Sequence, residues 1–333
     1  MHFLNVGHGD CTIVKHPSGR LTMIDINNSQ SFDKESFQEL VKTRLDEKKR
    51  NSSLGGIYNA LIPQSGLGVF GELTKQREAE EEIKAEAKIE LEDPVAFLQC
   101  VYPGQALWRF VMTHPDLDHM RGIKRLYETV GFTNFWDTKN TKPTPNFWGN
   151  DDRADWEFYQ AIRSGQSGAK LLNYTRGASL YAFGKDENGQ PGGDNIEILS
   201  PTDELVAACN KARKSNSLSL VLRVSHAGKS ILLPGDAEED AWDIMVARYG
   251  QSLKSDFLKA PHHGRDSAYH LKALQLICPK ITFVSVGRKP DTDASSKYRQ
   301  QSGRVASTRY HGNIELRIHD NGSHEWFVQR NSD

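Results

Sequence analysis

Cysteine is scarce in this chain of 333 residues, and its four cysteines are widely separated. Cys11, Cys100, Cys209 and Cys278 include no Cys-x-x-Cys pair. This distribution argues against a disulfide framework and against a thiolate zinc site. It favours a reducing compartment, so we expect a cytoplasmic protein.

Long apolar runs are also missing. No stretch approaches the roughly eighteen consecutive apolar residues that a transmembrane helix needs. Residues 1–7 read as a strand, without the basic start and apolar centre of a signal peptide. We therefore expect no association with a membrane.

An excess of charge of one sign is absent as well. The 42 Lys and Arg residues nearly balance the 43 Asp and Glu residues, which gives a net charge of −1. This balance excludes a globally basic nucleic-acid coat, so contact with a polyanion requires a local patch. With 37% hydrophobic and 26% charged residues, the composition is that of a globular protein. We expect a single domain over 1–333.

Two segments differ in composition from the rest of the chain. Residues 28–105 are strongly charged, with a predicted helix over 74–93 and a glycine-rich loop over 52–71. We interpret 28–105 as a partly helical insertion. Residues 135–190 begin with many aromatic side chains, which either pack a core or form a lid over a cleft, and core packing is the commoner role. These aromatics are Phe135, Trp136, Phe147, Trp148, Trp156, Phe158 and Tyr159.

The strongest chemical signal is the segment Thr-His-Pro-Asp-Leu-Asp-His at 113–119. It places four metal-ligand side chains directly after an apolar strand predicted over 107–113. Burying so many polar groups at a strand end is costly unless something compensates them. Imidazole nitrogens and carboxylate oxygens together suit zinc, manganese or iron.

Three other predicted strands end in side chains of the same kind. Asp25 ends the strand after the first turn, Asp236 follows the apolar run 232–235, and His262 and His263 follow the strand at 256–260. Four strand ends that carry ligand-type side chains suggest one shared metal site.

The order of these motifs resembles the metallo-β-lactamase superfamily. More narrowly, it resembles the metallo-β-lactamase domain of ComEC-type competence and DNA-uptake proteins, because residues 3–11 read Phe-Leu-Asn-Val-Gly-His-Gly-Asp-Cys. Segments 219–222, 232–236 and 259–267 resemble later blocks of that domain, whereas 28–105 and 135–190 match none of it. The resemblance implies an α/β fold of the αββα type: two mixed β-sheets face each other, with helices outside and metals at one edge.

The resemblance also implies roles for individual residues. His114 and Asp116 would hold one metal ion, Asp236 would bridge two, and Asp25 would orient the 114–119 loop. Of the two adjacent histidines we favour His263 as the ligand and His262 as a proton donor, although the sequence leaves this choice open. The second metal would be held by Asp118, His119 and His263, and the expected catalytic residues are Asp118, Asp236 and His262.

The chain departs from the superfamily pattern at two positions. The superfamily usually has a further histidine some twenty residues before the bridging aspartate, but residues 214–219 read Lys-Ser-Asn-Ser-Leu-Ser. Asn216 is a poor substitute, so we expect the first of two metal sites to be weaker. Asp116 replaces the second histidine of the commoner motif. The extra carboxylate favours Mn²⁺, and Zn²⁺ remains an alternative.

The predicted chemistry is hydrolysis. Two metals that share a water lower its pKa, and the resulting hydroxide attacks a carbonyl or phosphoryl centre. The resemblance implies a phosphodiesterase or nuclease that acts on DNA, free-standing because no membrane channel accompanies it. A basic segment following a predicted strand could hold the phosphate backbone, or it could be an ordinary solvated surface. Its cations are Arg288, Lys289, Lys297, Arg299, Arg304 and Arg309.

Two other functions remain open at this point. The chain could hydrolyse a small substrate such as a phosphorylcholine-type ester, a cyclic nucleotide or a lactone, with the aromatic segment as a pocket wall. It could also be a non-catalytic metal-binding interaction module. Under the nuclease interpretation, the 28–105 insertion could bind a regulatory protein that restrains an effector or DNA-processing enzyme.

Overall fold

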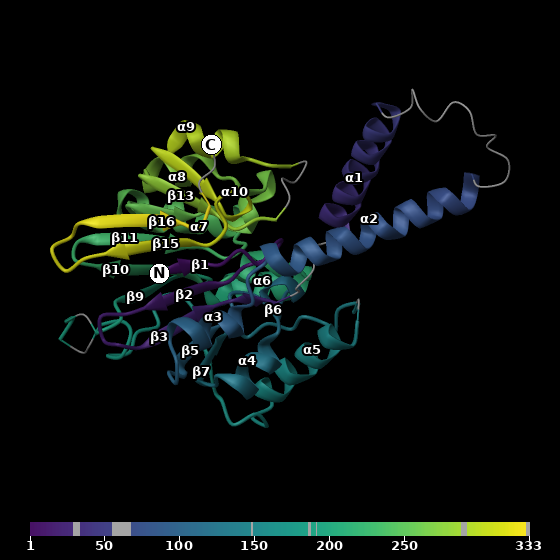
Figure 1. Cartoon of the computed structure of the whole chain (residues 1–333). Helices are drawn as coiled ribbons and strands as arrows, with labels where there is room; N and C mark the ends of the chain where they lie inside the picture. Colours follow the sequence, from purple (N-terminus) through teal and green to yellow (C-terminus); the bar gives the residue numbers. More distant parts are fainter. Residues whose placement is uncertain are drawn as a thin grey trace.

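Two β-sheets face each other in the computed structural model, and helices cover their outer faces (Figure 1). The predicted fold class, an α/β sandwich of the metallo-β-lactamase type, is thereby confirmed. The structure describes residues 1–28, 34–54, 68–147, 149–185, 188–190, 192–287 and 292–330.

The first sheet contains strands from both ends of the chain. Its order is β16-β15-β1-β2-β3-β5-β7-β8, so the C-terminal hairpin lies directly beside the first strand. The strands from β3 to β8 in this order run parallel to one another. The bounds are β1 (His2–Phe3), β2 (Thr12–Lys15), β3 (Leu21–Ile24), β5 (Leu107–Val111), β7 (Phe132–Asp137), β8 (Lys170–Asn173), β15 (Ile314–Ile318) and β16 (His324–Val328).

The second sheet is formed from one continuous part of the chain, in the order β14-β13-β12-β11-β10-β9. Strands β11 to β14 are parallel, and β9, β10 and β11 are antiparallel neighbours. A two-stranded ladder of β4 (Ile26–Asn27) and β6 (Met120–Arg121) lies apart from both sheets. The bounds are β9 (Ile196–Ser200), β10 (Val221–His226), β11 (Lys229–Leu233), β12 (Phe257–Lys259), β13 (Ile281–Val284) and β14 (Arg304–Ser307).

Both faces of each sheet are buried, which explains why the strands read as nearly continuous apolar runs. In β2, Ile13 faces the helices outside and Val14 faces the other sheet. In β11, Leu232 packs against the outer helices, whereas Ile231 and Leu233 point into the space between the sheets. Successive strand residues point to opposite faces, so an apolar run supplies two cores at once.

Each sheet carries its own helices. Within the described residues, no helix combines the length and the apolar character needed to cross a membrane. The first sheet is covered by α3 (Pro94–Val101), α4 (Ile123–Thr129) and α5 (Asn150–Arg163); the second is covered by α6 (Asp203–Ala212), α7 (Glu239–Tyr249), α8 (Leu271–Ile277) and α9 (Ser295–Gln301); α10 (Thr308–His311) follows β14.

The aromatic segment belongs mainly to the core of the first half. Of its aromatics, four are buried in strand β7 or helix α5, and two pack against the same core. Trp148 lies outside the described residues. The core-packing interpretation of the described aromatics is therefore confirmed. The buried four are Phe135, Trp136, Trp156 and Tyr159, and the other two are Phe147 and Phe158.

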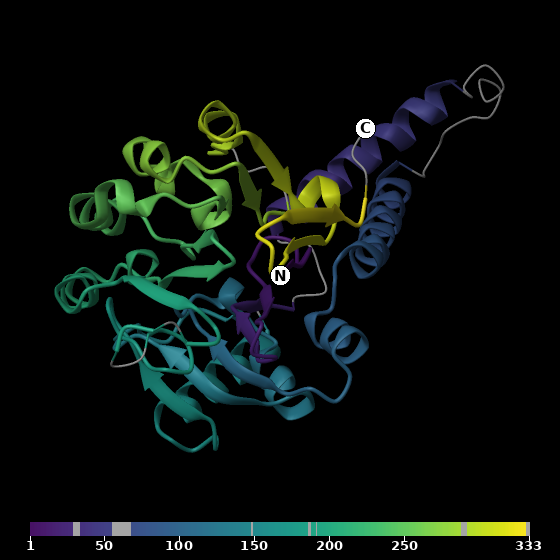
Figure 2. The ribbon, with the colours of Figure 1, turned by 90° about the vertical axis from the view of Figure 1, so that its left-hand side faces the viewer.

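Helices α1 (Lys34–Leu54) and α2 (Gly68–Glu90) form an antiparallel arm that projects from the sandwich (Figures 1 and 2). A small apolar contact including Val41 and Ile83 joins them, and Arg44 forms an ion pair with Glu82 at 2.7 Å. The sequence predicts α2 only over 74–93 and does not predict α1. Most of the loop predicted over 52–71 lies outside the described residues.

A buried ion pair joins the two halves beneath the sheets. Arg109 of β5 is 1% exposed and contacts Asp194, which lies just before β9. The Arg109 guanidinium also lies 5.2 Å from the ring centroid of Trp136, and Asp194 forms a second ion pair with Arg20 at 3.3 Å. Removing one partner of such a pair leaves the other charge buried without compensation.

We predict that Asp194→Ala lowers the free energy of unfolding by about 3–5 kcal/mol, because it strands the Arg109 charge inside the protein. Urea-induced unfolding followed by tryptophan fluorescence measures this loss. The matched control is Glu197→Ala, which removes an exposed partner of Arg223 and costs about 0–1 kcal/mol. Equal losses in the two variants would contradict the proposed role of the buried pair.

Candidate metal centre

The ligand-type side chains collect at one edge of the sandwich because parallel strands end there. Asp25 follows β3, His114 lies three residues after β5, Asp236 lies three residues after β11, and His263 follows β12. The two sheets thus contribute through the carboxyl ends of their strands, which is where ligands bind in sheets of this kind.

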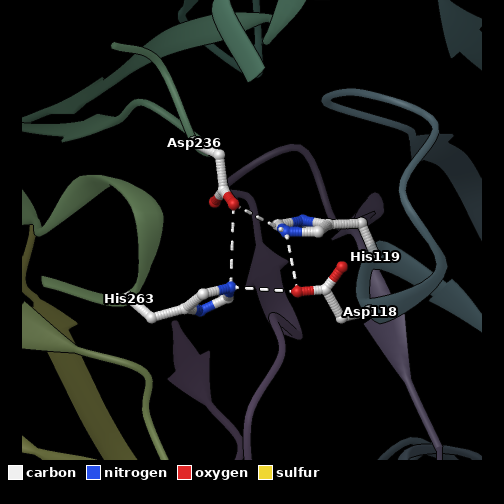
Figure 3. A group of neighbouring side chains, drawn as sticks. All are labelled: Asp118, His119, Asp236 and His263. Carbon is white, nitrogen blue, oxygen red and sulfur yellow. Dashed lines mark hydrogen bonds and ion pairs between the residues drawn. The ribbon is translucent and has the colours of Figure 1, made fainter. Parts of the chain in front are cut away.

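Four of the predicted ligands come together in a buried cluster (Figure 3). Asp118, His119, Asp236 and His263 each offer one atom, and these atoms all lie within 4.8 Å of one another. His119 Nε2 lies 3.3 Å from Asp236 Oδ2, and His263 Nε2 lies 3.2 Å from Asp118 Oδ2. This set is the second metal site that the resemblance implies.

The cluster has the donors that a divalent cation requires. In the described part of the chain, two further buried atoms at the site, Asp236 Oδ1 and His114 Nε2, have no hydrogen-bond partner. Unpaired buried polar atoms are costly, and a cation in the cluster would give Asp236 a partner. Two carboxylates and two imidazoles suit Zn²⁺ or Mn²⁺, so the residues fit the predicted metal.

Hydrogen bonds on the far side of the imidazoles fix their orientation. His119 Nδ1 donates to Asp25 Oδ2 at 2.8 Å, and His263 Nδ1 donates to the carbonyl of Ser285 at 3.1 Å. Each bond leaves Nε2 directed into the cluster. Partners of this kind hold a metal-binding histidine in the required tautomer and position.

Protonation of the two histidines compensates the carboxylates when no metal is bound. Burial alone lowers their pKa, but the neighbouring carboxylates outweigh it. Asp236 and Asp25 raise the pKa of His119 well above its usual value. Asp236 and Asp10 raise the pKa of His263 to about 10. Because coordination needs a neutral ring, metal binding displaces these protons.

The backbone around the cluster adopts left-handed conformations that side chains other than glycine rarely take. Asp25 has φ 57°, His262 has φ 48° and His263 has φ 55°. At Gly235 a Cβ atom would lie 2.8 Å from the side chain of Thr113, so only glycine allows this close approach. Strain of this kind concentrates at functional sites.

His262 and His263 take different positions. His263 is fully buried in the cluster, as favoured from the sequence. The His262 side chain is 21% exposed, and its Nε2 lies 3.8 Å from Asp236 Oδ2. On its other side, Nδ1 lies 3.0 Å from Ser267 Oγ and 3.3 Å from Glu238 Oε1. His262 therefore lies at the rim, where it faces both the cluster and solvent.

The residues implied for a first metal lie beside the cluster. His114 Nε2 is 3.7 Å from Asp116 Oδ1 and 3.8 Å from Asp236 Oδ2. Asp116 also contacts the ammonium group of Lys142. Asn216 points away from both metal positions, because its amide donates to Glu238 at 3.0 Å.

Sequence reasoning gave no role to two residues that support the cluster. Asp10 is buried, contacts Lys259 Nζ, and lies 3.7 Å from His263 Nδ1 through its second oxygen. Burial alone raises the pKa of Asp10, but Lys259 and His263 hold it well below its usual value. The signal was available, because Asp10 closes the opening motif and Lys259 ends the strand before the paired histidines.

The predicted basic segment divides on the structure. Asp266 N donates to the carbonyl of Thr292 at 2.7 Å, so the start of α9 lies next to the histidine motif. Lys297 and Arg299 are on α9, and Lys297 pairs with Asp266 at 2.8 Å. Arg309 follows the end of β14, whereas Arg304 begins it and stacks over Trp326. Arg288 and Lys289 lie outside the described residues.

Two histidines outside the motifs also find their places. His8 lies with its ring centroid 4.5 Å from that of His263, so it does approach the metal edge, and Arg265 contacts it at 3.2 Å. His226 lies at the far hairpin and pairs with Asp320, in agreement with its assignment as a turn residue.

Fold and cluster together define a metallo-β-lactamase-fold protein with a candidate divalent-metal centre. The chain matches no protein-family model. It is 31% identical over 221 residues to ComE operon protein 3 of Bacillus subtilis, which covers 62% of this chain and 24% of that protein. It is 28% identical over 102 residues to competence protein ComA of Neisseria gonorrhoeae, covering 31% of this chain and 14% of that protein.

An uncharacterized Escherichia coli protein, YcaI, is 29% identical over 114 residues, which are 33% of this chain and 15% of that protein. The chain thus spans about a quarter or less of the length of these curated relatives. The resemblance to ComEC-type competence proteins is confirmed by these matches.

Solved structures with a similar arrangement share little sequence with the chain. The metallo-β-lactamase fold protein YhfI from Bacillus subtilis has a TM-score of 0.42 and 10% identity, with 98% of both chains covered. Igni18, a metallo hydrolase from Ignicoccus hospitalis, has a TM-score of 0.37 and 15% identity, with 70% of this chain and 84% of that chain covered.

We predict that Asp25→Asn weakens binding of Mn²⁺ about 10–100-fold, because the amide cannot accept from both Thr113 and His119. Asparagine tolerates the left-handed backbone at this position, so the substitution changes the hydrogen bonds and spares the turn. Equilibrium dialysis followed by metal analysis measures the affinity. Asp243→Asn, at an exposed partner of His270, is the control. An affinity of Asp25→Asn within twofold of wild type would refute the prediction.

Proposed function

We propose that this protein is a metal-dependent phosphodiesterase that cleaves DNA. The observation that carries the proposal is the buried cluster of Asp118, His119, Asp236 and His263 in a chain that resembles ComEC-type competence proteins. A divalent ion bound there would supply Lewis acidity and a lowered pKa for a coordinated water.

The protein side chains divide the remaining tasks. Asp118 and Asp236 supply the negative charge that holds the cation. Asp118 is 27% exposed at its side chain and therefore also reaches the substrate side of the cluster. Asp236 is the proposed bridging ligand, since it lies within 4 Å of His114, His119 and His263.

His262 is the proposed proton donor to the leaving oxygen. Its Nδ1 is held by Ser267 and Glu238, which leaves Nε2 at the open rim of the cluster. The hydrogen bond with His262 lowers the pKa of Glu238, so this carboxylate stays charged and stabilises an imidazolium next to it. A general acid needs this placement beside the reacting phosphate.

The substrate class rests on the cations near this rim. Lys297 and Arg299 on α9, Arg309 after β14 and Arg265 beside His8 all follow strands that end at the metal edge. Arg288, Lys289 and Arg304 remain part of the predicted nucleic-acid surface. A phosphate backbone is held by cations of this kind, and its affinity falls steeply with salt.

The proposed location is the cytoplasm, because all four cysteines are unpaired. The proposed partner surface is the α1–α2 arm. It extends away from the sandwich, and its exposed acidic side chains would suit a basic face of another protein (Figure 2).

We predict that the metal-stripped protein cleaves DNA after addition of Mn²⁺ or Zn²⁺, and that Asp236→Ala lowers the rate at least about 100-fold because it removes the shared ligand. Linear and circular, single- and double-stranded DNA are compared on gels. Asp243→Ala is the control for loss of a carboxylate elsewhere. Circular dichroism confirms that both variants fold.

The alternatives give different results in the same experiment. Hydrolysis of bis-p-nitrophenyl phosphate without cleavage of any DNA would transfer the assignment to a small phosphodiester. Metal binding without hydrolysis of either substrate would identify an interaction module. The described aromatics of 135–190 that are buried in the core give the small-substrate alternative no pocket wall.

We predict that the triple variant Lys297→Ala, Arg299→Ala, Arg309→Ala weakens DNA binding and flattens its dependence on salt by about one unit of logarithmic slope per lost phosphate contact. Fluorescence anisotropy at 50–300 mM NaCl, about the range in which such binding changes most, measures both quantities. The control triple variant replaces Lys15, Lys170 and Lys280, which lie where β2 ends and where β8 and β13 begin, away from the metal edge. Equal slopes for the two triple variants would exclude the proposed surface.

A further inference from the structure

Lys142 occupies the part of the site where the superfamily pattern calls for another metal ligand. Its Nζ contacts Asp116, and it lies 3.4 Å from the Oγ atom of Ser215. Ser215 belongs to the segment in which the sequence lacks the expected histidine. The lysine therefore reaches, from a distant part of the chain, the same place that this missing side chain would fill.

The lysine is held in place by a network of polar contacts. Asn140, two residues earlier, donates to Tyr159 Oη at 2.8 Å and to Asp137 Oδ1 at 3.1 Å. Thr141 N donates to Asn210 Oδ1 on α6 at 2.9 Å, and Asn210 returns a bond to the carbonyl of Lys139 at 2.9 Å. These contacts anchor the loop to both halves of the sandwich. Lys142 is consequently directed at Asp116 with its side chain only 18% exposed.

A cation held by His114 and Asp116 would lie within a few ångströms of this ammonium group. Lys142 contacts Asp116 Oδ1, the oxygen that lies 3.7 Å from His114 Nε2. Two positive charges at that spacing repel strongly, and the repulsion is largest where the site is partly buried. The lysine also satisfies Asp116, which would otherwise be a carboxylate without compensation. The cluster of Asp118, His119, Asp236 and His263 has no such competitor among the described residues.

We propose that Lys142 takes the place of the first metal ion, so that the protein binds one divalent cation, at Asp118, His119, Asp236 and His263. The inference rests on the metal site of the proposed function and deepens it. The ammonium then supplies the positive charge on the His114 side of the site, where it can donate to a phosphoryl oxygen of the substrate.

Metal stoichiometry tests the proposal without any measurement of activity. The full chain is dialysed against micromolar Mn²⁺, bound metal is measured by mass spectrometry, and electron paramagnetic resonance distinguishes an isolated ion from a coupled pair. We expect one Mn²⁺ per wild-type chain with the spectrum of an isolated ion. In Lys142→Met, which keeps the length and removes the charge, the affinity for a second Mn²⁺ rises at least about 10-fold.

Two variants serve as matched controls. Lys142→Arg keeps the positive charge and is expected to bind one Mn²⁺. Lys139→Met removes an exposed lysine from the same loop and is also expected to bind one. Two ions per wild-type chain at similar affinity, or an unchanged second affinity in Lys142→Met, would overturn the proposal. Failure to cleave DNA refutes only the proposed function, because the stoichiometry is measured independently of cleavage.

Discussion

Burial of acidic side chains against positively charged partners is the constraint on which the rest of the site depends. Asp10 is compensated by Lys259, Asp25 by His119 and Thr113, and Asp116 by Lys142. An unpaired carboxylate in these positions would be too costly to bury. The pairing leaves Asp118 and Asp236 as the carboxylates that a cation can bind, so the supporting contacts determine where metal goes as much as the ligands do.

The sequence was sufficient for the fold class and for the cluster, since both follow from local patterns. The 114–119 motif comes directly after an apolar strand, and parallel strands necessarily end at a common edge. Lys142 could not be predicted, because its contact with Asp116 depends on how a loop from 138–142 is anchored by Asn140 and Asn210. The separation of Arg304 from Arg309 likewise depends on the register of β14, which short-range patterns do not specify.

The strained turns around the cluster show what the fold gives up for this arrangement. Asp25, His262 and His263 all have positive φ, and each places a functional side chain at a strand end. Their conformations are maintained by contacts that cross between the sheets, such as the hydrogen bond from His262 N to the carbonyl of Gly235 at 3.1 Å. The rigidity of the two packed sheets therefore keeps the metal ligands in place before any cation binds.

The position of β15 and β16 beside β1 has a consequence for biogenesis. The second sheet comes from one uninterrupted stretch, so its strands can pair as soon as that stretch has left the ribosome. The first sheet stays incomplete until the last hairpin is synthesised, because β1 has β15 as its neighbour. The cluster draws ligands from both sheets, so it assembles only when translation is essentially finished. A nascent chain thus lacks a competent site, which keeps a metal-dependent hydrolase silent while it is still attached to the ribosome.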